Sequence, residues 1–451
     1  MRTIIEKLRS ATRGTEYEGR LYLVGGIVRD RVMGLSAEED VDVVLEGDAA
    51  QLAAFLYNKQ ISAHPPTTYP RFGTAMLRVG GSRVEFVGAR KESYDPTSRK
   101  PATEPGSLQD DVLRRDFTIN TLLENLHTGE ILDLTSKARQ DIRDHIIRTP
   151  QDPLVTFEDD PLRMLRAIRF ASRFGFRIDP ETYDAIKKQS HRLDIVSAER
   201  IRGEFSKILM TEDAPGGLEM LRETRLLEGF APELAATYGV RQNKYHRYDV
   251  WHHSLKTLEH IPVEQGIVMR LAALLHDVGK APTRTVDEEG EAHFYGHEAV
   301  GAEIAQRLLR RLTYSNAKAE EVGFLISMHL RVGSYRDDWS DTAMRRLIRD
   351  AGGYLDKLIV LTEADRTAAR SSARDADLTP FRKRLAEVKI KLEGRKIASP
   401  LNGREIMEAL GLATGPNIGK VKKYLEEQVV AGNLLPGDKA RARELIRDFE
   451  F

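Results

Sequence analysis

The sequence of 451 residues has no cysteine, no long hydrophobic run and no net charge. Without cysteine it has no disulfide, thiolate metal site or cysteine nucleophile, so any metal site must use His and carboxylates. No stretch approaches the roughly 18 consecutive apolar residues of a membrane span. The opening residues MRTIIEKLRS also lack the apolar core of a secretory signal. We therefore expect a cytoplasmic protein without a membrane partner.

The charges are numerous and evenly split, with 69 Lys and Arg against 69 Asp and Glu. Taken alone, this balance argues against a nucleic-acid partner, because such partners usually require a basic surface. Hydrophobic residues make up 41% of the chain, which is enough for packed cores and excludes a disordered chain. At roughly 100–200 residues per domain, the length predicts three or four domains.

Residue patterns change along the chain. Short apolar or alternating runs at 21–24, 41–45, 74–79 and 83–87 predict strands, and residues 27–34 have a helical pattern that ends at a glycine. From Phe157 onward, helical periods replace strand patterns. The predicted fold class is α+β, a mixed-sheet head followed by an all-α body.

The predicted organisation has four parts. They are a catalytic head at 1–150, a helical neck or body at 151–240, a His-rich domain at 241–375 and a helical tail at 376–451.

The first candidate site lies in the head. A strand runs into Gly25-Gly26 and directly into a helix, which lets backbone N–H groups approach a phosphate; the alternative is a tight strand-to-helix turn. Asp40 and Asp42 fall on one face of the next strand, because side chains alternate along a strand. Two neighbouring carboxylates in a partly buried strand repel one another unless a cation joins them.

Together with Arg29-Asp30, these residues resemble motif A of the nucleotidyltransferase superfamily that contains tRNA CCA-adding enzymes and bacterial poly(A) polymerases. Further motifs of its class II branch follow in order. RRDFTIN at 114–120 is similar to the element that borders the ribose, and DDPLR at 159–163 resembles the start of the nucleotide-template helix. SAERI at 197–201 resembles the element that braces this helix, and 403–419 resembles the family's carboxy-terminal section.

The resemblance implies addition of CCA to the tRNA 3′ end from CTP and ATP, with release of pyrophosphate. Asp40 and Asp42 would hold Mg²⁺ as the catalytic carboxylates. Glu85 is a candidate third carboxylate, or else a solvated strand acid. The implied nucleotide-binding residues are Gly26, Arg29, Arg115, Asp116, Asp160, Arg163, Arg166 and Arg169.

Hydrogen-bond chemistry gives Asp160 and Arg163 a role in base choice. Arg163 donates to O2 and N3 of cytosine or to N1 of adenine, while Asp160 accepts from the exocyclic amine. Uracil and guanine present the opposite groups, so each leaves buried polar groups unpaired. The alternative is that Asp160, followed by Pro161, is an ordinary helix N-cap and that the arginines of this helix are solvated.

Residues 88–111 are rich in Pro, Ser, Lys and Arg and predict a mobile loop. The resemblance implies that enzymes adding the whole CCA sequence use a flexible loop here and that CC-adding relatives have it shortened. The length of the segment favours full CCA addition but does not separate it from A-only addition.

A second candidate site is built from histidine and aspartate. Four residues resemble the ligands of the HD phosphohydrolase superfamily. They are His253 in WHHSL, His276 and Asp277 in LLHDVGK, and Asp365 in LTEADRT. These ligand types suit Mg²⁺, Mn²⁺ or Ni²⁺. His297 and His329 are candidates for a second ion, or else packing or capping residues. The resemblance implies either hydrolysis of 2′,3′-cyclic phosphate or phosphomonoester ends of RNA, or an RNA-binding module without turnover.

The leading hypothesis is therefore CCA addition to tRNA. Its near alternatives are an A-adding tRNA nucleotidyltransferase and a poly(A) polymerase. Two alternatives come from other classes: a metal-dependent phosphohydrolase with an inactive head, and a non-catalytic RNA-binding protein. The balanced net charge would then be a sum over unlike regions, and we expect a basic face from Arg163 towards the carboxy-terminal helices. No pattern indicates the oligomeric state.

Overall fold

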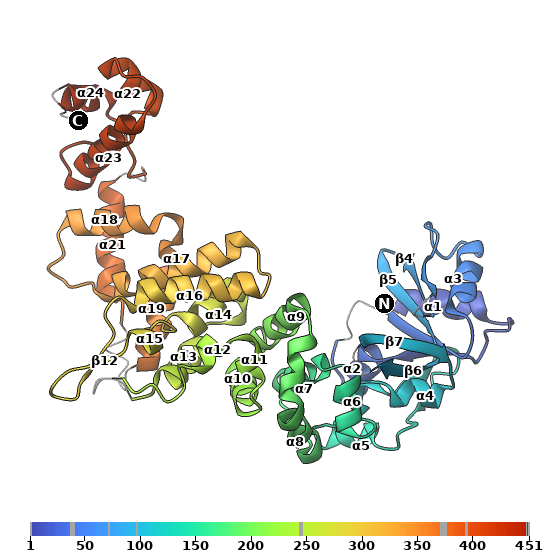
Figure 1. Ribbon diagram of the computed structural model, residues 1–451. Coiled ribbons are helices and arrows are strands. Elements are labelled where there is room, and N and C mark those ends of the chain that lie inside the picture. The colour runs from blue at the N-terminus through green and yellow to red at the C-terminus, as the bar shows by residue number, and fades with distance from the viewer. Residues whose placement is uncertain are drawn as a thin grey trace. The chain divides into compact units, whose positions relative to one another are not determined.

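A computed structural model describes residues 2–36, 41–70, 73–95, 98–242, 247–369, 377–392, 396–447 and 449. The chain forms two compact units, Met1–Pro232 and Glu233–Phe451. The first unit contains the mixed sheet and the second is helical apart from one short hairpin, so the predicted fold class is confirmed (Figure 1). The finer division into four domains stays a prediction. None of the described helices has the length and hydropathy that crossing a bilayer requires.

The first unit is organised around a seven-stranded sheet in the order β3-β4-β5-β2-β1-β8-β9. Strands β2 and β5 pair in parallel, while the other neighbouring pairs are antiparallel. The strands are β1 (Leu21–Val24), β2 (Val41–Leu45), β3 (Thr67–Tyr69), β4 (Thr74–Val79), β5 (Ser82–Gly88), β8 (Leu123–Asn125) and β9 (Ile131–Leu132).

The predicted strands and the first predicted helix are confirmed. Burial of Leu23, Val43 and Phe86, each 0% exposed, explains why these short apolar runs form the centre of the sheet. Helix α2 (Gly26–Val32) follows β1 directly, and α3 (Ala49–Asn58) packs against β4 and β5. The remaining helices around the sheet are α1 (Arg2–Thr12), α4 (Leu108–Leu113) and α5 (Ala138–Arg143).

The segment predicted as a loop forms a β-hairpin instead. Strands β6 (Arg90–Asp95) and β7 (Ser98–Pro105) pair antiparallel as a separate two-stranded sheet. Ser107 then starts α4 with a capping box in which Ser107 and Asp110 exchange hydrogen bonds. The loop prediction was wrong because strand signals in a sequence come from buried apolar residues, and this hairpin has polar residues at most positions.

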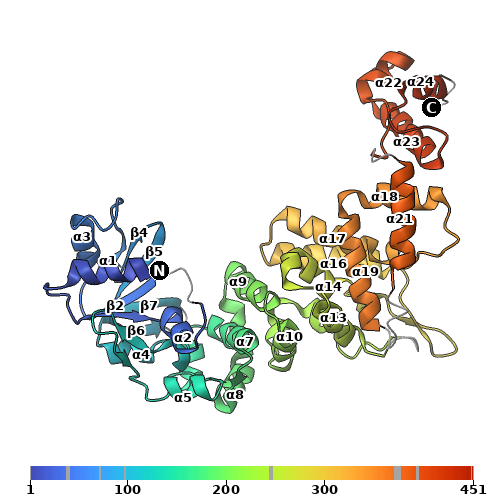
Figure 2. The same cartoon turned by 180° about the vertical axis from the view of Figure 1, so that it is seen from behind.

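The rest of the first unit is helical, as predicted from Phe157 onward. Helices α7, α9 and α10 contact one another and lie together when the molecule is viewed from behind (Figure 2). The short strands β10 (Ile146–Ile147) and β11 (Arg177–Ile178) pair in parallel before and after α7. The helices are α6 (Pro153–Asp159), α7 (Leu162–Phe174), α8 (Pro180–Gln189), α9 (Ala198–Leu209), α10 (Ala214–Glu223) and α11 (Leu226–Phe230), followed at the boundary by α12 (Pro232–Ala235).

The second unit begins with a helical bundle in which α13, α14, α17 and α19 contact one another and α16 packs along α17. Its hairpin pairs β12 (Thr285–Val286) with β13 (Ala292–His293). The helices are α13 (Val250–Glu259), α14 (Gly266–Leu275), α15 (Lys280–Thr283), α16 (His297–Arg311), α17 (Asn316–Gly333), α18 (Asp341–Ala351) and α19 (Leu355–Ala369).

The carboxy-terminal helices have a small core of their own. Leu401, Ile406, Val421 and Leu425 are all 0% exposed and belong to one buried cluster. The helices are α21 (Thr379–Lys391), α22 (Gly403–Leu410), α23 (Pro416–Ala431) and α24 (Lys439–Ile446).

Candidate functional site

The first unit contains a cavity of about 730 Å³ between the sheet and the helices α7 and α9. This volume lies within the roughly 300–1,000 Å³ range of small-molecule sites. Most of its charged lining residues are basic. The lining residues are Gly25, Gly26, Arg29, Asp42, Arg115, Asp116, Asn120, Arg166, Arg169, Phe170, Arg173, Lys207, Met210, Thr211 and Glu212.

Asp42 is the carboxylate that the sheet presents to this cavity. Of the five β2 residues it alone is not buried. Glu85 lies beside it on β5, because the two residues are register partners, although Glu85 is not among the described lining residues. Asp40, the predicted second carboxylate, falls outside the described residues.

Gly25 is required by the backbone beside Asp42. Its φ of +77° lies in the region that L side chains rarely adopt. A Cβ at this position would also lie 3.7 Å from Oδ2 of Asp42 and 3.9 Å from Nη1 of Arg115. These are ordinary contact distances, so the positive φ, not a lack of space, is what favours glycine here.

Two arginines of the RRD element share one buried acid. Asp111 is 0% exposed and accepts from Arg115 Nη2 at 2.8 Å and from Arg114 Nε at 3.0 Å. Burial alone would raise the pKa of Asp111, but the two arginines outweigh it and the pKa is lowered. This acid therefore holds Arg115 at the cavity wall.

Asp116 joins the RRD element to α7. Its Oδ2 accepts from Arg166 Nη2 at 2.6 Å, and its Oδ1 accepts from Asn120 Nδ2 at 2.9 Å. Burial opposes ionisation of Asp116, but the charge of Arg166 and the hydrogen bond from Asn120 hold its pKa well below the ordinary value. Asn120 Oδ1 in turn accepts from Arg29 Nη1 at 2.8 Å.

Phe170 supports the basic wall of the cavity. The guanidinium carbons of Arg169, Arg29 and Arg166 lie 4.3, 5.2 and 5.4 Å from its ring centroid, which is cation–π distance. Buried Glu204 on α9 pairs with Arg169 Nη1 at 3.1 Å. Burial and the neighbouring charge of Arg166 lower the pKa of Arg169 to about 10, so the guanidinium remains charged at neutral pH.

Asp160 and Arg163 are not among the described residues that line the cavity. Asp160 Oδ1 accepts from the backbone N–H of Leu162 at 3.2 Å, and Oδ2 accepts from Arg200 Nη2 at 2.7 Å. Arg163 is 8% exposed and donates to the backbone oxygens of Arg114 and Thr156. The contact expected of a helix N-cap, from the backbone of Leu162 to Asp160, is therefore present. The side chains of Asp160 and Arg163 are not among the described residues that line the cavity.

Sequence reasoning missed several lining residues. Phe170 lies four residues after Arg166 and hence on the same helix face, a spacing that could have identified it. Lys207, Thr211 and Glu212 come from the end of α9 and the residues after it, and only the packing of α9 on α7 places them here. Together with Asp42, these residues form a cavity able to bind a polyanion and a divalent cation.

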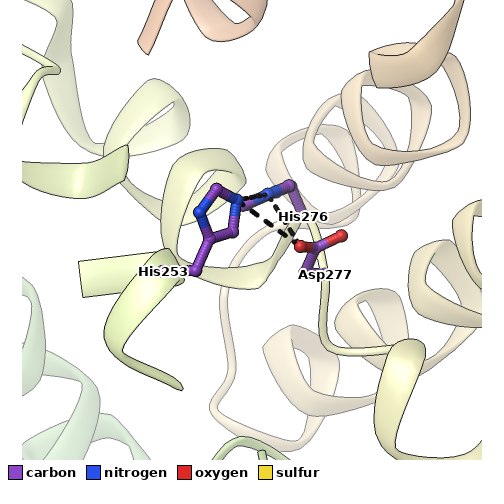
Figure 3. Close-up of side chains that lie close together, drawn as sticks. All are labelled: His253, His276 and Asp277. Atoms are coloured by element: carbon purple, nitrogen blue, oxygen red, sulfur yellow. Dashed lines mark hydrogen bonds and ion pairs between the residues drawn. The ribbon is translucent and has the colours of Figure 1, made fainter. Parts of the chain in front are cut away.

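The second unit contains a buried cluster of histidine and aspartate side chains, which are residue types that bind metal ions (Figure 3). His253 Nε2 lies 2.9 Å from Asp365 Oδ1 and 3.3 Å from His276 Nε2, which in turn lies 3.2 Å from Asp277 Oδ2. The four side chains come from α13, the end of α14 and α19, so the structure brings together all four candidate ligands predicted from the sequence.

These separations fit a metal ion. Ligand atoms about 2.0–2.2 Å from an ion lie about 3 Å apart at neighbouring octahedral positions. Three of the four side chains are also at least 98% buried, and a buried carboxylate such as that of Asp277 is stabilised by a nearby cation. The cluster therefore has the donor set and spacing for a divalent ion.

A second group of donors meets the other oxygen of Asp277. His297 Nε2 lies 3.4 Å and His329 Nε2 lies 3.9 Å from Asp277 Oδ1. His297 Nε2 is buried and has no hydrogen-bond partner among the described residues. The alternative that these two histidines serve only in packing leaves this nitrogen unexplained.

Backbone carbonyls orient three of the histidines in the same way. Nδ1 of His276, His297 and His329 lies 2.9, 2.8 and 2.6 Å from the carbonyl three residues earlier. With Nδ1–H donating to that oxygen, each Nε2 faces Asp277, which is the orientation of metal-binding histidines.

The charged groups in this cluster shift one another's pKa values. Burial lowers the pKa of His276, but Asp277 and Asp365 outweigh it and raise that pKa to about 10. Burial, followed by the charge of His276, lowers the pKa of His329 to about 4. Lys280 adds a cation, because its Nζ lies 2.7 Å from Asp277 Oδ2 while donating to Gln242 Oε1 at 2.7 Å.

Family comparisons match both sites. The family described as poly(A) polymerase head domain matches residues 21–148. The family described as the probable RNA- and SrmB-binding site of polymerase A matches 175–237, and the HD domain matches 244–370.

Curated relatives match nearly the whole chain. It is 32% identical over 437 residues to an A-adding tRNA nucleotidyltransferase of Deinococcus radiodurans, covering 93% of this chain and 94% of that one. It is 31% identical over 430 residues to a CC-adding tRNA nucleotidyltransferase of Thermus thermophilus, covering 93% and 92%. The chain therefore belongs to the tRNA nucleotidyltransferase and poly(A) polymerase family, and it carries an HD domain.

A solved structure confirms the fold. The Bacillus stearothermophilus CCA-adding enzyme in complex with CTP matches with a TM-score of 0.67 and 24% identity, covering 99% of this chain and 96% of that chain. Nucleotidyltransferase and HD families generally use divalent metal ions, in keeping with the carboxylate and histidine donors of the two sites.

Proposed function

We propose that this protein adds CCA to the 3′ end of tRNA, using CTP and ATP. The observation that carries the proposal is the basic cavity around Asp42 in a chain related along its length to tRNA nucleotidyltransferases. In the reaction the primer 3′-oxygen forms a bond to the α-phosphorus, the bond to the β-phosphate oxygen breaks, and pyrophosphate leaves. The hydroxyl proton passes to solvent.

Positioning and charge neutralisation account for most of the catalysis of such a transfer. Asp42 and Asp40 are the proposed Mg²⁺ ligands, and a bound ion supplies charge neutralisation and lowers the pKa of the attacking hydroxyl. Arg166 and Arg169 face the cavity from α7 and are assigned to the triphosphate. Arg29 and Gly26 are assigned to its other side, and Arg115 and Asp116 to the sugar hydroxyls.

Asp160 and Arg163 are proposed to select the base. Two N–H groups of Arg163 are used by backbone oxygens, and a guanidinium has five. The Asp160 carboxylate likewise keeps lone pairs beyond those used by Leu162 and Arg200. Both groups therefore retain the hydrogen-bonding capacity to read cytosine or adenine and to reject uracil or guanine.

A-only addition is the second candidate for the head, because an A-adding enzyme matches 93% of the chain. The β6–β7 hairpin occupies the segment that the family resemblance describes as shortened in CC-adding enzymes. This retained segment favours a product that includes the terminal A.

The test supplies tRNA transcripts that end before C74, after C74 or after C75, with CTP, ATP or both, and sizes the products. Addition of two C and one A followed by arrest supports CCA addition. Extension of the CC-ended primer alone supports A-only addition, and a long A ladder supports a poly(A) polymerase.

The matched pair Asp42→Asn and Asp144→Asn tests the active site. Asp42→Asn should reduce the extension rate by on the order of 100-fold or more, while the exposed Asp144→Asn should not change it. Wild-type extension by Asp42→Asn would overturn the assignment of Asp42.

For the second unit we propose a divalent-metal phosphohydrolase acting on 2′,3′-cyclic phosphate or phosphomonoester ends of RNA. His253, His276, Asp277 and Asp365 are the proposed ligands of Mg²⁺, Mn²⁺ or Ni²⁺, and His297 and His329 with Asp277 the proposed ligands of a second ion. A bound ion supplies a water of lowered pKa and neutralises phosphate charge. Water oxygen bonds to phosphorus, one ring P–O bond breaks, and the leaving oxygen takes the proton.

Incubation with a 2′,3′-cyclic nucleotide and each of the three metals tests this activity. Turnover that is lost in Asp277→Asn but kept in the exposed Asp356→Asn supports it. No turnover with any of the metals would leave the HD domain as a binding module. A cytoplasmic location remains a prediction.

A further inference from the structure

An aromatic pair stands on the surface of the HD domain. Tyr295 is 79% exposed, the highest value among the described large hydrophobic residues. Its ring stacks on that of His293, with centroids 5.5 Å apart and planes 4° from parallel. The two rings are therefore parallel and offset, and most of the tyrosine ring is open to solvent.

The pair is held in place by the hairpin. His293 Nε2 lies 2.6 Å from Asp287 Oδ2, and Tyr295 Oη lies 3.4 Å from His293 Nδ1. His293 is also the register partner of Thr285 in β12. Asp287 fixes the ring of His293, and Tyr295 packs parallel to that ring and contacts it through its hydroxyl. We call the exposed flat ring of Tyr295 the platform.

This surface is close in sequence to one of the proposed metal ligands. Tyr295 precedes His297 by two residues, which places their Cα atoms at most about 7.6 Å apart along the chain. The side chains of Asp365 and His297 are 25% and 10% exposed, against 1–2% for the other donors. The centre therefore reaches solvent where these two side chains lie, and one of them, His297, is two residues from Tyr295 along the chain.

We propose that Tyr295 stacks on the nucleobase of the substrate whose phosphate lies at the metal centre. A flat aromatic surface binds any base, because every base has a π face. The substrate class of the HD domain is then a nucleoside cyclic phosphate or an RNA end, not a base-free phosphate ester. This inference rests on the proposed HD function, and it assigns Tyr295 as a specificity-determining residue.

The test uses the full chain with Mn²⁺ and compares wild type, Tyr295→Ala, Tyr295→Phe and the control Tyr69→Ala, another exposed tyrosine. Guanosine 2′,3′-cyclic phosphate is the nucleoside substrate, since the proposed head pocket rejects guanine, and glycerol 1,2-cyclic phosphate is the base-free one. In Tyr295→Ala, the ratio of their kcat/KM values should fall about tenfold or more. Tyr295→Phe should retain the ratio within about twofold, and Tyr69→Ala should leave it unchanged.

Calorimetric titration with guanosine 3′-monophosphate decides the inference even if neither substrate is hydrolysed. Weaker binding in Tyr295→Ala, by about tenfold, with wild-type affinity in Tyr295→Phe, supports the platform. Equal affinity in wild type and Tyr295→Ala, or no binding to the metal-loaded wild type, overturns it. An equal loss for both cyclic phosphates would also overturn it, because that pattern indicates a structural role. If only turnover is absent, the proposed hydrolysis is rejected, but stacking of Tyr295 on the base is not.

Discussion

Phe170 lies beneath three guanidinium groups at the wall of the nucleotide cavity. Its ring attracts these like charges to one place, while Glu204, Asp116 and Asp30 each pair with one of them. The proposed triphosphate site is thus arranged in the absence of nucleotide, which would reduce the ordering that binding must accomplish.

Phe170→Leu should therefore raise the KM for nucleotide while reducing the stability of the fold only modestly. We expect the free energy of unfolding to fall by about 1–2 kcal/mol and the KM for ATP to rise several-fold as the arginines lose their common support. The matched control is Phe205→Leu, a buried ring paired with Phe230. Unfolding measurements and steady-state kinetics of both variants test this prediction. Equal KM values for ATP in Phe170→Leu and Phe205→Leu would contradict it.

The Asp116–Arg166 pair predicts a pH dependence of stability. Asp116 has a pKa well below its ordinary value when folded, and about 3.9 when unfolded. Its contribution is therefore complete above about pH 4–5 and is lost as the pH falls towards the folded pKa. Asp116→Asn should cost about 1–3 kcal/mol at pH 7, and this difference should shrink by pH 3.

Denaturant unfolding of wild type and Asp116→Asn at pH 3 and 7 measures that difference. Asp144→Asn, at an exposed position, is the control for removing a carboxylate. A difference that is the same at both pH values would exclude Asp116 as the titrating group.

At the scale of elements, the β6–β7 hairpin and helix α7 differ in how they are attached to the rest of the first unit. The hairpin is a separate two-stranded sheet, whereas α7 is fixed by hydrogen bonds from Arg163 and Arg166 to the RRD element. A segment with few ties to the sheet can be altered without loss of the core.

Replacing residues 92–103 by a short Gly-Ser turn should therefore leave C addition intact and reduce A addition strongly. The expected product from a tRNA lacking CCA is one ending in CC. Product sizing with CTP and ATP measures this, and thermal unfolding at the wild-type temperature controls for the fold. Normal CCA product from the shortened chain would remove the hairpin from nucleotide selection.

At the scale of the whole molecule, zero net charge coexists with local basic sites. The nucleotide cavity is mainly basic. In the second unit, a groove between α18 and α23 is lined by Arg349, Lys422 and Lys423 together with Glu426 and Glu427. Neither lysine has an ion pair among the described residues. Such sites attract phosphates although the total charge sums to zero.

Binding of tRNA should therefore be salt-dependent. We expect affinity to fall at least tenfold between about 50 and 200 mM salt, because phosphate contacts release counterions. Lys422→Gln with Lys423→Gln should reduce the slope of log K against log salt by about one to two. The α21 pair Lys383→Gln with Lys389→Gln is the charge-matched control. An affinity independent of salt would contradict phosphate contacts in both units.

Much of this protein follows from its sequence alone. Short apolar runs at 21–24 and 41–45 and alternating residues at 74–79 and 83–87 indicate the strands, because a sheet core requires burial on alternate or both faces. The resemblance of WHHSL, HDVGK and LTEADRT to the HD superfamily indicated four candidate ligands, and the structure brings these four side chains together. Ordered motifs likewise indicated the family before any geometry was known.

Tertiary structure alone decided the pairing of individual atoms. His253 and Asp365 meet across 112 positions, and Arg166 meets Asp116 across 50. Packing also fixed which oxygen of Asp277 faces which histidines, brought Lys207 and Phe170 to the cavity and folded a polar segment into a hairpin. Local patterns record burial and period, whereas these contacts depend on how distant elements pack, and no short stretch of sequence contains that information.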